Sequence, residues 1–137
     1  MTDRVSAETR SSIMRRVKGE NTKPEIIVRS SLHRAGLRFR LHPKKLPGHP
    51  DIILPKYKAV VFVHGCFWHR HPECKNSTTP NSNLEYWLPK FARTVERDNN
   101  NSSLLVQMGW RVFIIWECEI NEERLSDLCD EIRDFKN

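Results

Sequence analysis

Residues 51–63 read Asp-Ile-Ile-Leu-Pro-Lys-Tyr-Lys-Ala-Val-Val-Phe-Val. Two short runs rich in β-branched residues flank a Pro-Lys-Tyr-Lys segment, and this pattern predicts a β-hairpin. A turn centred in that segment places Asp51 opposite Phe62, with Val63 and His64 just beyond on the neighbouring strand. The open end of the hairpin therefore brings together a carboxylate, backbone carbonyls and an imidazole.

Helical patterns occur on both sides of the hairpin. A capping-box pattern opens a helix over residues 22–35, and apolar spacing predicts a second helix from Pro89 to Gly109 and a third over 122–135. The residues expected to face inward are Phe91, Val95 and Leu105 in the second helix, and Leu125, Leu128, Ile132 and Phe135 in the third.

Two further segments predict strands. Residues 37–41 alternate apolar and basic side chains, which is typical of a half-buried strand, and residues 110–116 form an apolar run that predicts a buried strand. Helices flanking a mixed β-sheet make the fold class α/β. We expect a single domain over residues 21–137, preceded by a separate arm over residues 1–20.

The charge balance indicates a polyanionic partner. The chain has 137 residues, with 23 Lys+Arg against 17 Asp+Glu and a pI near 9.4. Such an excess of cations suits nucleic acid, because each phosphate contact releases counterions. A long apolar stretch and a signal-peptide pattern are both missing, so a membrane is disfavoured. Four cysteines without a secretory signal favour the reducing cytoplasm.

Two acidic residues have competing interpretations. Asp51 at the open end of the hairpin could hold a hard cation such as Mg²⁺, which prefers carboxylate and carbonyl oxygens. It could equally end a loop after Pro50, as Asp often does. Glu25 stands three residues after Thr22 and could simply complete a capping box. Glu25 can act in catalysis only if the start of its helix points at the hairpin.

A dense cluster of zinc-type ligands lies in residues 66–74, Cys-Phe-Trp-His-Arg-His-Pro-Glu-Cys. Thiolates and imidazoles are the donors that tetrahedral zinc takes. Either histidine of the segment could be the ligand, and Cys118 is a candidate for the fourth position. A complete set of four protein ligands would make the zinc structural. Cys129 falls on the inward stripe of the last helix and is expected to be a core residue.

Aromatic residues lie among these ligands. Phe67 and Trp68 sit in a polar loop, with Trp87 further along the chain. Exposed aromatics beside basic groups can wedge between base steps or stack on bases. The alternative is that they cover the zinc site or the edge of the sheet.

At this point the chain resembles the very short patch repair (Vsr) endonucleases. The resemblance extends from about residue 8 to residue 120. It rests on Pro50-Asp51, on His64-Gly-Cys-Phe-Trp-His69 with His71 and Cys74, on Val95-Glu-Arg-Asp98, and on Gly109-Trp-Arg-Val with Trp116-Glu-Cys118. It implies a restriction-endonuclease-like fold. The implied activity is nicking of double-stranded DNA 5′ to the mispaired T of T:G mismatches, which arise from deamination of 5-methylcytosine.

The resemblance also implies a role for each site residue. Asp51 would bind catalytic Mg²⁺ with the backbone of Val63. His69 would be the general base, oriented by Asp98, and His64 and Glu25 would assist at the scissile phosphate. The structural zinc would be held by Cys66, His71, Cys74 and Cys118. The DNA-intercalating residues would be Phe67, Trp68 and Trp87 from the major groove, and Met14 of the arm from the minor groove.

The expected protein is a bacterial, nucleoid-associated monomer, with mismatch-repair proteins as further candidate partners. Two positions depart from the family pattern. Val63 replaces a threonine, and the spacing from His71 to Cys74 is one residue longer, with Pro72 inserted. Two rival interpretations are another restriction-type nicking nuclease and a non-catalytic zinc module that binds distorted DNA. The second acid and the lysine usual after Asp51 in restriction-type nucleases are missing here, which favours a histidine-based mechanism.

Overall fold

A computed structural model describes residues 22–134 of the chain. The expected N-terminal arm over residues 1–20, with Met14, lies outside the described residues, as does Phe135. Within the described part, none of the helices combines the length and apolar character that crossing a bilayer requires.

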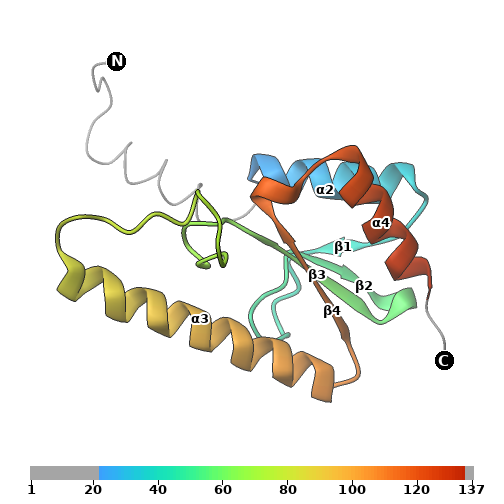
Figure 1. The fold of residues 1–137 in the computed structure, drawn as a ribbon. Coiled ribbons are helices and arrows are strands. Elements are labelled where there is room, and N and C mark those ends of the chain that lie inside the picture. The colour runs from blue at the N-terminus through green and yellow to red at the C-terminus, as the bar shows by residue number, and fades with distance from the viewer. Residues whose placement is uncertain (1–21, 135–137) are drawn as a thin grey trace, which may run out of the picture.

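A four-stranded mixed sheet forms the centre of the fold (Figure 1). The strands lie in the order β1 (Arg40–Leu41), β2 (Ile52–Leu54), β3 (Ala59–His64) and β4 (Arg111–Trp116). The first three strands are antiparallel, whereas β3 and β4 are parallel. The predicted hairpin is confirmed, because Ile52 pairs with Val61 across the short helix η1 (Pro55–Tyr57). Asp51 donates its N–H to the carbonyl of Val61 at 3.1 Å, which continues this register.

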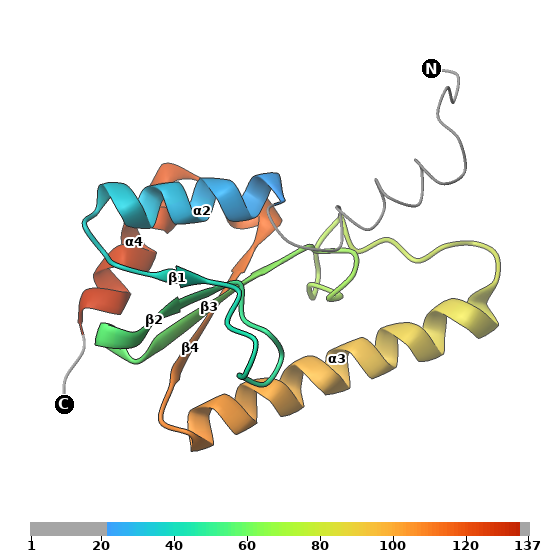
Figure 2. The same ribbon diagram turned by 180° about the vertical axis from the view of Figure 1, so that it is seen from behind.

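Helices cover both faces of the sheet in a three-layer arrangement (Figures 1 and 2). α2 (Lys23–Arg34) and α4 (Glu122–Arg133) lie on one face, where Leu32, Leu128 and Ile132 pack against Ile52 and Val61. α3 (Leu84–Gln107) lies on the other face, with Leu105 against a second cluster that contains Ile53, Val60 and Phe62. The alternate residues of β2 and β3 thus face different helices. This arrangement confirms a mixed sheet flanked by helices.

The inward face of α4 is confirmed for Leu125, Leu128 and Ile132, and Cys129 is a buried core residue among them. The end of this helix is fixed by a cation: Arg111 of β4 donates to the carbonyls of Glu131 and Ile132. A strand and the last helix are therefore joined by polar contacts as well as by the core.

The predicted start of α3 is wrong. The helix begins at Leu84, so Pro89 lies inside it rather than at its beginning. A proline there removes one helical hydrogen bond. Packing of Trp87 on Phe91, one helical turn apart with ring centroids 5.5 Å apart, stabilises the helix across this point. Val95 was also placed wrongly, because it is 37% exposed, whereas Phe91 and Leu105 are buried as expected.

The two remaining strands are less regular than predicted. Only residues 40–41 of the segment 37–41 pair with β2, because the chain turns away from the last turn of α2 and Leu37 is used to bury the helix end. β4 begins at Arg111, one residue later than predicted, and only its Ile115 is fully buried. β4 is an edge strand with one neighbour, so its apolar side chains are shared between the core clusters and a partly open edge.

Two adjacent leucines of α3 test this layering. Leu105 is completely buried against the sheet, whereas Leu104 is 46% exposed. We expect Leu105→Ala to lower the free energy of unfolding by about 2–5 kcal/mol through lost burial and a residual cavity. Leu104→Ala removes the same atoms from the surface and should change it by less than about 0.5 kcal/mol. Urea denaturation of both variants measures the difference. Equal effects would contradict the packing of α3 on the sheet.

Candidate active site and metal centre

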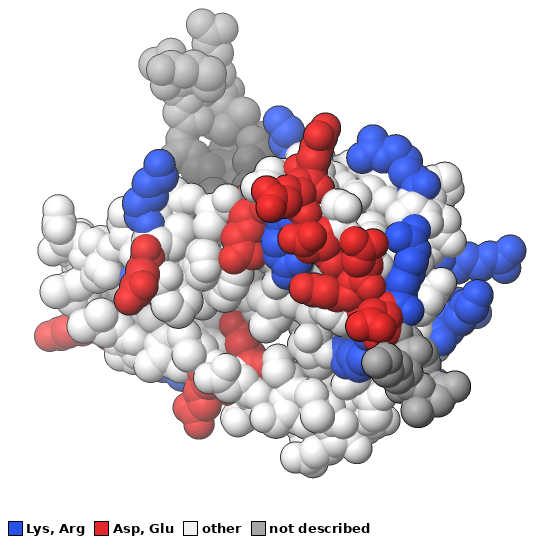
Figure 3. All heavy atoms as spheres, turned by 45° about the vertical axis from the view of Figure 1, so that its right-hand side comes forward, with Lys and Arg blue, Asp and Glu red and all other residues white. Residues whose placement is uncertain are grey.

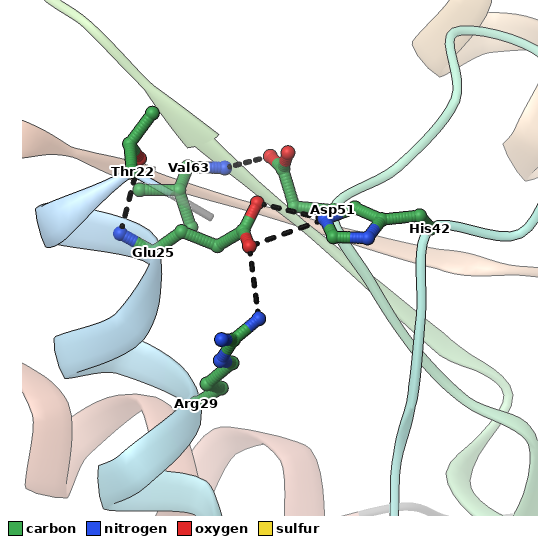
Figure 4. Close-up of polar contacts among 6 residues, drawn as sticks. All are labelled: Thr22, Glu25, Arg29, His42, Asp51 and Val63. Carbon is green, nitrogen blue, oxygen red and sulfur yellow. Dashed lines mark hydrogen bonds and ion pairs between the residues drawn. The ribbon is translucent and has the colours of Figure 1, made fainter. Parts of the chain in front are cut away.

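A first polar cluster lies where the start of α2 meets the open end of the hairpin (Figure 4). Glu25 is almost completely buried, with 1% of its surface exposed. Its carboxylate oxygens lie 3.1 Å from Nε2 of His42 and 3.2 Å from Nη1 of Arg29. Thr22 accepts the backbone N–H of Glu25 at 3.4 Å, so the N-cap of α2 fixes where this carboxylate points.

Asp51 completes the cluster. Its Oδ2 accepts the backbone N–H of Val63 at 2.7 Å. Ligand atoms of Glu25, His42 and Asp51 all lie within 4.8 Å of one another. Burial, together with the neighbouring charge of Glu25, raises the pKa of Asp51 to about 7, although the Val63 N–H opposes the shift. Two carboxylates so placed suit a divalent cation, whose charge would offset both the burial and their mutual repulsion.

His42 was missed by sequence reasoning. It follows β1 directly, and its N–H donates to the carbonyl of Asp51 at 3.1 Å, which places it beside the hairpin end. The pairing of residues 37–41 with 51–54 would have found it, because Leu41 pairs with Ile52. That pairing is hard to infer from sequence, since the irregular loop between the strands leaves their register open.

A second cluster contains the histidines and the acid predicted for proton transfer. Nδ1 of His69 lies 2.7 Å from Oδ2 of Asp98 on α3. A carboxylate accepts, so Nδ1 carries the proton and Nε2 presents a lone pair. His64 stacks on His69, with ring centroids 3.8 Å apart and an interplanar angle of 6°. This arrangement fixes both the tautomer and the plane of the His69 ring.

His64 is itself held as a neutral ring. Burial, with the adjacent His69, lowers its pKa to about 4, and Asp98 only partly opposes this. Trp116 packs its edge against the ring at 5.1 Å. Nδ1 of His64 is buried and has no hydrogen-bond partner among residues 22–134. A buried polar atom without a partner calls for an explanation such as a functional role or a bound water or ion.

A third cluster brings together Cys66, His71, Cys74 and Cys118, with all four ligand atoms within 4.8 Å of one another. The sulfurs of Cys74 and Cys118 are 3.7 Å apart, and Nδ1 of His71 is 3.3 Å from the sulfur of Cys118. Zinc–sulfur bonds of about 2.3 Å in a tetrahedron place two sulfurs roughly 3.8 Å apart. The donor set and spacing therefore fit zinc. His71 joins this set, whereas His69 is bonded to Asp98.

The third cluster is anchored to the sheet and to its own loop. Glu117 accepts the N–H of Cys66 at 3.1 Å, and His71 stacks on Trp116 with centroids 4.2 Å apart. Burial raises the pKa of the Cys66 thiol to about 12, so a bound cation would be needed to hold it as a thiolate. Between His71 and Cys74, Glu73 adopts a left-handed φ of 57°.

An aromatic cluster occupies the space between the zinc-type loop and the start of α3. Phe67 packs edge-on against Trp68, Trp87 and Phe91, with centroids 5.0–5.7 Å apart. The first three rings are half-buried, while Phe91 is buried. Sequence reasoning placed these rings beside basic groups but missed the residue that organises them.

That residue is Arg70, whose guanidinium lies 3.8 Å from the centroid of the Phe91 ring. It also donates to the carbonyls of Phe67, Ser77 and Thr78 and to the hydroxyl of Thr79. A planar cation with five donors can stack and bond at once. Arg70 therefore ties the two halves of the loop to α3.

Comparison with known proteins places this geometry in a family. The model of the DNA mismatch endonuclease Vsr family matches residues 2–76. The chain is 47% identical to the type II nicking enzyme V.XorIIP of Xanthomonas oryzae, over 95% of this chain and 98% of the relative. It is 41% identical to the DNA mismatch endonuclease Vsr of Escherichia coli, over 93% of this chain and 81% of the relative. The chain belongs to the Vsr family.

Membership of the Vsr family makes the protein a DNA endonuclease, so the interpretation as a non-catalytic zinc module is wrong. The fold agrees with this. The structure resembles the catalytic domain of the homing endonuclease I-Bth0305I, with a TM-score of 0.52 and 20% identity. The likeness covers 84% of this chain and 94% of that domain. It supports the endonuclease-type fold that the sequence implies.

In this Vsr-family chain the structure brings together all the predicted site residues within residues 22–134. They form three clusters and one aromatic group. The first cluster contains Glu25 and Asp51, and the second contains His64, His69 and Asp98. The third contains Cys66, His71, Cys74 and Cys118, and the aromatic group contains Phe67, Trp68 and Trp87. Val63 contacts Asp51 through its N–H, and the use of its carbonyl as a cation ligand stays a prediction.

The cysteine cluster generates a prediction about metal content. We expect Cys74→Ser to lose most of the bound zinc, because it removes one of four converging donors. Cys129→Ala removes a thiol from the core and should keep stoichiometric zinc. Metal analysis of the purified chains measures this, and chelation should lower the thermal midpoint of wild type more than that of Cys74→Ser. A zinc-free wild type would contradict the assignment.

The raised pKa of Asp51 generates a prediction about pH. Its folded-state pKa of about 7 exceeds the ordinary 3.8, so ionisation costs stability as the pH rises between those values. In Mg²⁺-free buffer at pH 8, Asp51→Asn should raise the free energy of unfolding by about 2 kcal/mol. This is less than the full pKa shift would correspond to, because the side chain is partly hydrated. The gain should disappear near pH 4, as followed by urea titration.

The exposed Asp127 of α4 provides the control for this series. Asp127→Asn should change stability by less than about 0.5 kcal/mol at either pH. An Asp51→Asn variant that is less stable than wild type at pH 8 would show that the carboxylate stabilises the metal-free fold.

Proposed function

We propose that this Vsr-family endonuclease nicks DNA 5′ to the mispaired T of T:G mismatches that arise from deamination of 5-methylcytosine, in a Mg²⁺-dependent reaction. The observation that carries this proposal is the His69–Asp98 pair, stacked on neutral His64 at the end of β3. The Asp51 cluster meets the same strand at Val63. Adjacent residues of β3 thus contact the two sites, Val63 the carboxylate site and His64 the His69–Asp98 pair.

Asp51 and Glu25, with the backbone carbonyl of Val63, would hold the Mg²⁺. When bound, the cation neutralises phosphate charge and lowers the pKa of a water. His42 and Arg29 hold the Glu25 carboxylate from two sides, so its oxygens are oriented before a cation arrives. We assign His42 a positioning role, because its Nε2 is already directed at Glu25.

His69 would act as the general base through its free Nε2. Asp98 stabilises the imidazolium that forms when Nε2 takes a proton, and it keeps the ring in the productive tautomer. His64 would assist at the scissile phosphate. Its stacking on His69 also sets the direction in which Nε2 points, and its lowered pKa keeps it neutral, so it does not repel the imidazolium.

The zinc cluster and the aromatic cluster would together recognise the mismatch. Zinc held by Cys66, His71, Cys74 and Cys118 would fix the loop that carries Phe67 and Trp68, with Trp87 facing them from α3. These three rings would enter the base stack from the major groove, and Met14, outside the described residues, from the minor groove. Unstacking costs least at a mispair, by up to a few kcal/mol, so the wedge itself favours T:G sites.

Expected partners follow from this chemistry. The substrate would be duplex DNA with a T:G mismatch, bound by a monomer, and mismatch-repair proteins are further candidates. Relatives named as type II nicking enzymes share the family, so nicking without mismatch selectivity is the alternative that an assay must separate.

Nicking of defined duplexes tests the proposal. We expect single-strand cutting 5′ to the T of a T:G duplex in Mg²⁺, at least about tenfold faster than on the matched duplex, and no cutting in excess chelator. His69→Ala should lower the rate about 10²- to 10⁴-fold with little change in DNA affinity, because it removes only the base. Gel assays with all mismatches in several sequence contexts measure both effects.

The exposed His33 of α2 provides the control, and His33→Ala should leave the rate unchanged. Equal cutting of matched and mismatched duplexes would favour a general nicking enzyme instead. Unchanged cutting by His69→Ala would remove the general-base assignment.

A further inference from the structure

Charge is divided between two sides of the molecule. Figure 3 shows acidic side chains gathered on the face that carries α4. Residues 117–134 supply eight of the chain's 17 Asp and Glu residues, and only two of its Lys and Arg residues. Because the chain as a whole is basic, its excess cations lie on other surfaces. One such surface is a flank of α3.

This flank of α3 forms an open groove of about 540 Å³. Its cations are Lys90, Arg93 and Arg97, and hydrogen-bonding capacity is added by Thr94 and two asparagines. One carboxylate, that of Glu96, also lines it. Positions three, four and seven residues apart share one side of a helix, so the three cations form a row.

The two arginines of this row are available to a ligand. Within residues 22–134, neither Arg93 nor Arg97 makes an ion pair, and both are exposed. Lys90 is half-buried, and its ammonium lies 5.6 Å from the ring centroid of Tyr86. Free guanidinium groups beside hydroxyl and amide side chains are the usual partners of phosphate oxygens.

The groove adjoins the proposed active site along α3, because Arg97 precedes Asp98, the acid bonded to His69. Four residues after Arg97, Asn101 packs against Gly48, where an added Cβ would lie only 2.9 Å from the asparagine Cβ. Figures 1 and 2 show the loop between β1 and β2 reaching α3 at this place.

The loop between β1 and β2 adds further cations to this row. Its Lys44 and Lys45 are exposed. The loop starts at His42 and ends at Asp51, so both of its ends belong to the first polar cluster. A basic surface therefore extends from Lys90 along α3 and onto a loop whose two ends belong to the first polar cluster.

We propose that the α3 groove, defined by Lys90, Arg93 and Arg97, binds the sugar–phosphate backbone of the DNA duplex beside the nicking site. The inference rests on the proposed function in one respect: it assumes that the DNA is cut at the site formed by His69 and Asp51. Backbone contacts position the duplex without reading its sequence, so the groove contributes equally to matched and mismatched DNA. Mismatch selectivity is left to the aromatic cluster.

The test is the salt dependence of binding by the full chain carrying Arg93→Gln and Arg97→Gln together. Affinity for a T:G duplex is measured in Mg²⁺-free buffer between about 50 and 200 mM salt. Losing two phosphate contacts should reduce the slope of log K against log[salt] by about 1.8, and weaken binding about tenfold or more at 0.1 M salt. The matched duplex should lose affinity by the same factor.

The matched control carries Arg34→Gln and Lys56→Gln, which remove the same net charge at the end of α2 and in the hairpin turn, away from α3 (Figure 1). It should reduce the slope by less than about 0.5. An unchanged slope in the groove variant would overturn the proposal. So would an equal reduction in the control, because net charge alone would then explain it.

Two further outcomes keep the proposals separate. If the wild type nicks matched and T:G duplexes equally while the groove variant shows a reduced slope, the mismatch proposal is overturned and the groove proposal is supported. Unfolding is excluded by an unchanged urea midpoint. If that midpoint falls, Arg93→Lys with Arg97→Lys replaces the variant. Retention of the wild-type slope by this charge-keeping pair supports phosphate binding, and loss of the slope overturns it.

Discussion

The parallel pairing of β3 with β4 is the constraint on which the sites depend. Its register ends with His64 opposite Trp116. Just after the two strands end, Cys66 and Cys118, which are far apart in sequence, lie in one ligand cluster. The N–H of Cys66 then bonds to the carboxylate of Glu117, so the register continues into the loop. A slip by one residue would turn His64 to the other face and separate the cysteines.

Helix α3 converts this strand end into a catalytic arrangement. It crosses from the zinc-type loop to the start of β4, and along the way it presents Trp87 and Phe91 to the loop and Asp98 to His69. The same helix therefore contacts the wedge and the base. Arg70 stacks on Phe91, so a change in the conformation of the loop also affects α3. The cysteine–histidine cluster, the aromatic cluster and the proposed proton acceptor share one support.

The polar clusters are costly to bury. Asp51 lies close to the buried Glu25, and burial together with this neighbouring charge raises the pKa of Asp51. Nδ1 of His64 is buried without a partner among the described residues. Each feature destabilises the metal-free and DNA-free chain, and each would be relieved by a cation or a phosphate. The layered core on both sides of the sheet supplies the stability that allows this.

The hairpin, the helix over 22–35 and the zinc-type ligands could be predicted from sequence because each depends on local spacing. β-Branched runs around a proline-containing turn place Asp51 near Val63, and a nine-residue segment with two cysteines and two histidines predicts a metal. The sequence could not say which histidine binds the metal, because His69 and His71 are chemically alike. Only the tertiary structure separates them, since Asp98 and Cys118, 29 and 47 residues away, select one each.

His42, Arg70 and the basic flank of α3 likewise depend on the folded chain. His42 reaches Glu25 only because β1 pairs with β2, and Pro89 lies inside α3 only because aromatic packing outweighs a lost hydrogen bond. Local sequence thus determined the chemistry available at the end of β3. Long-range packing decided which side chain takes each role, because that choice depends on distances between residues that no spacing along the chain specifies.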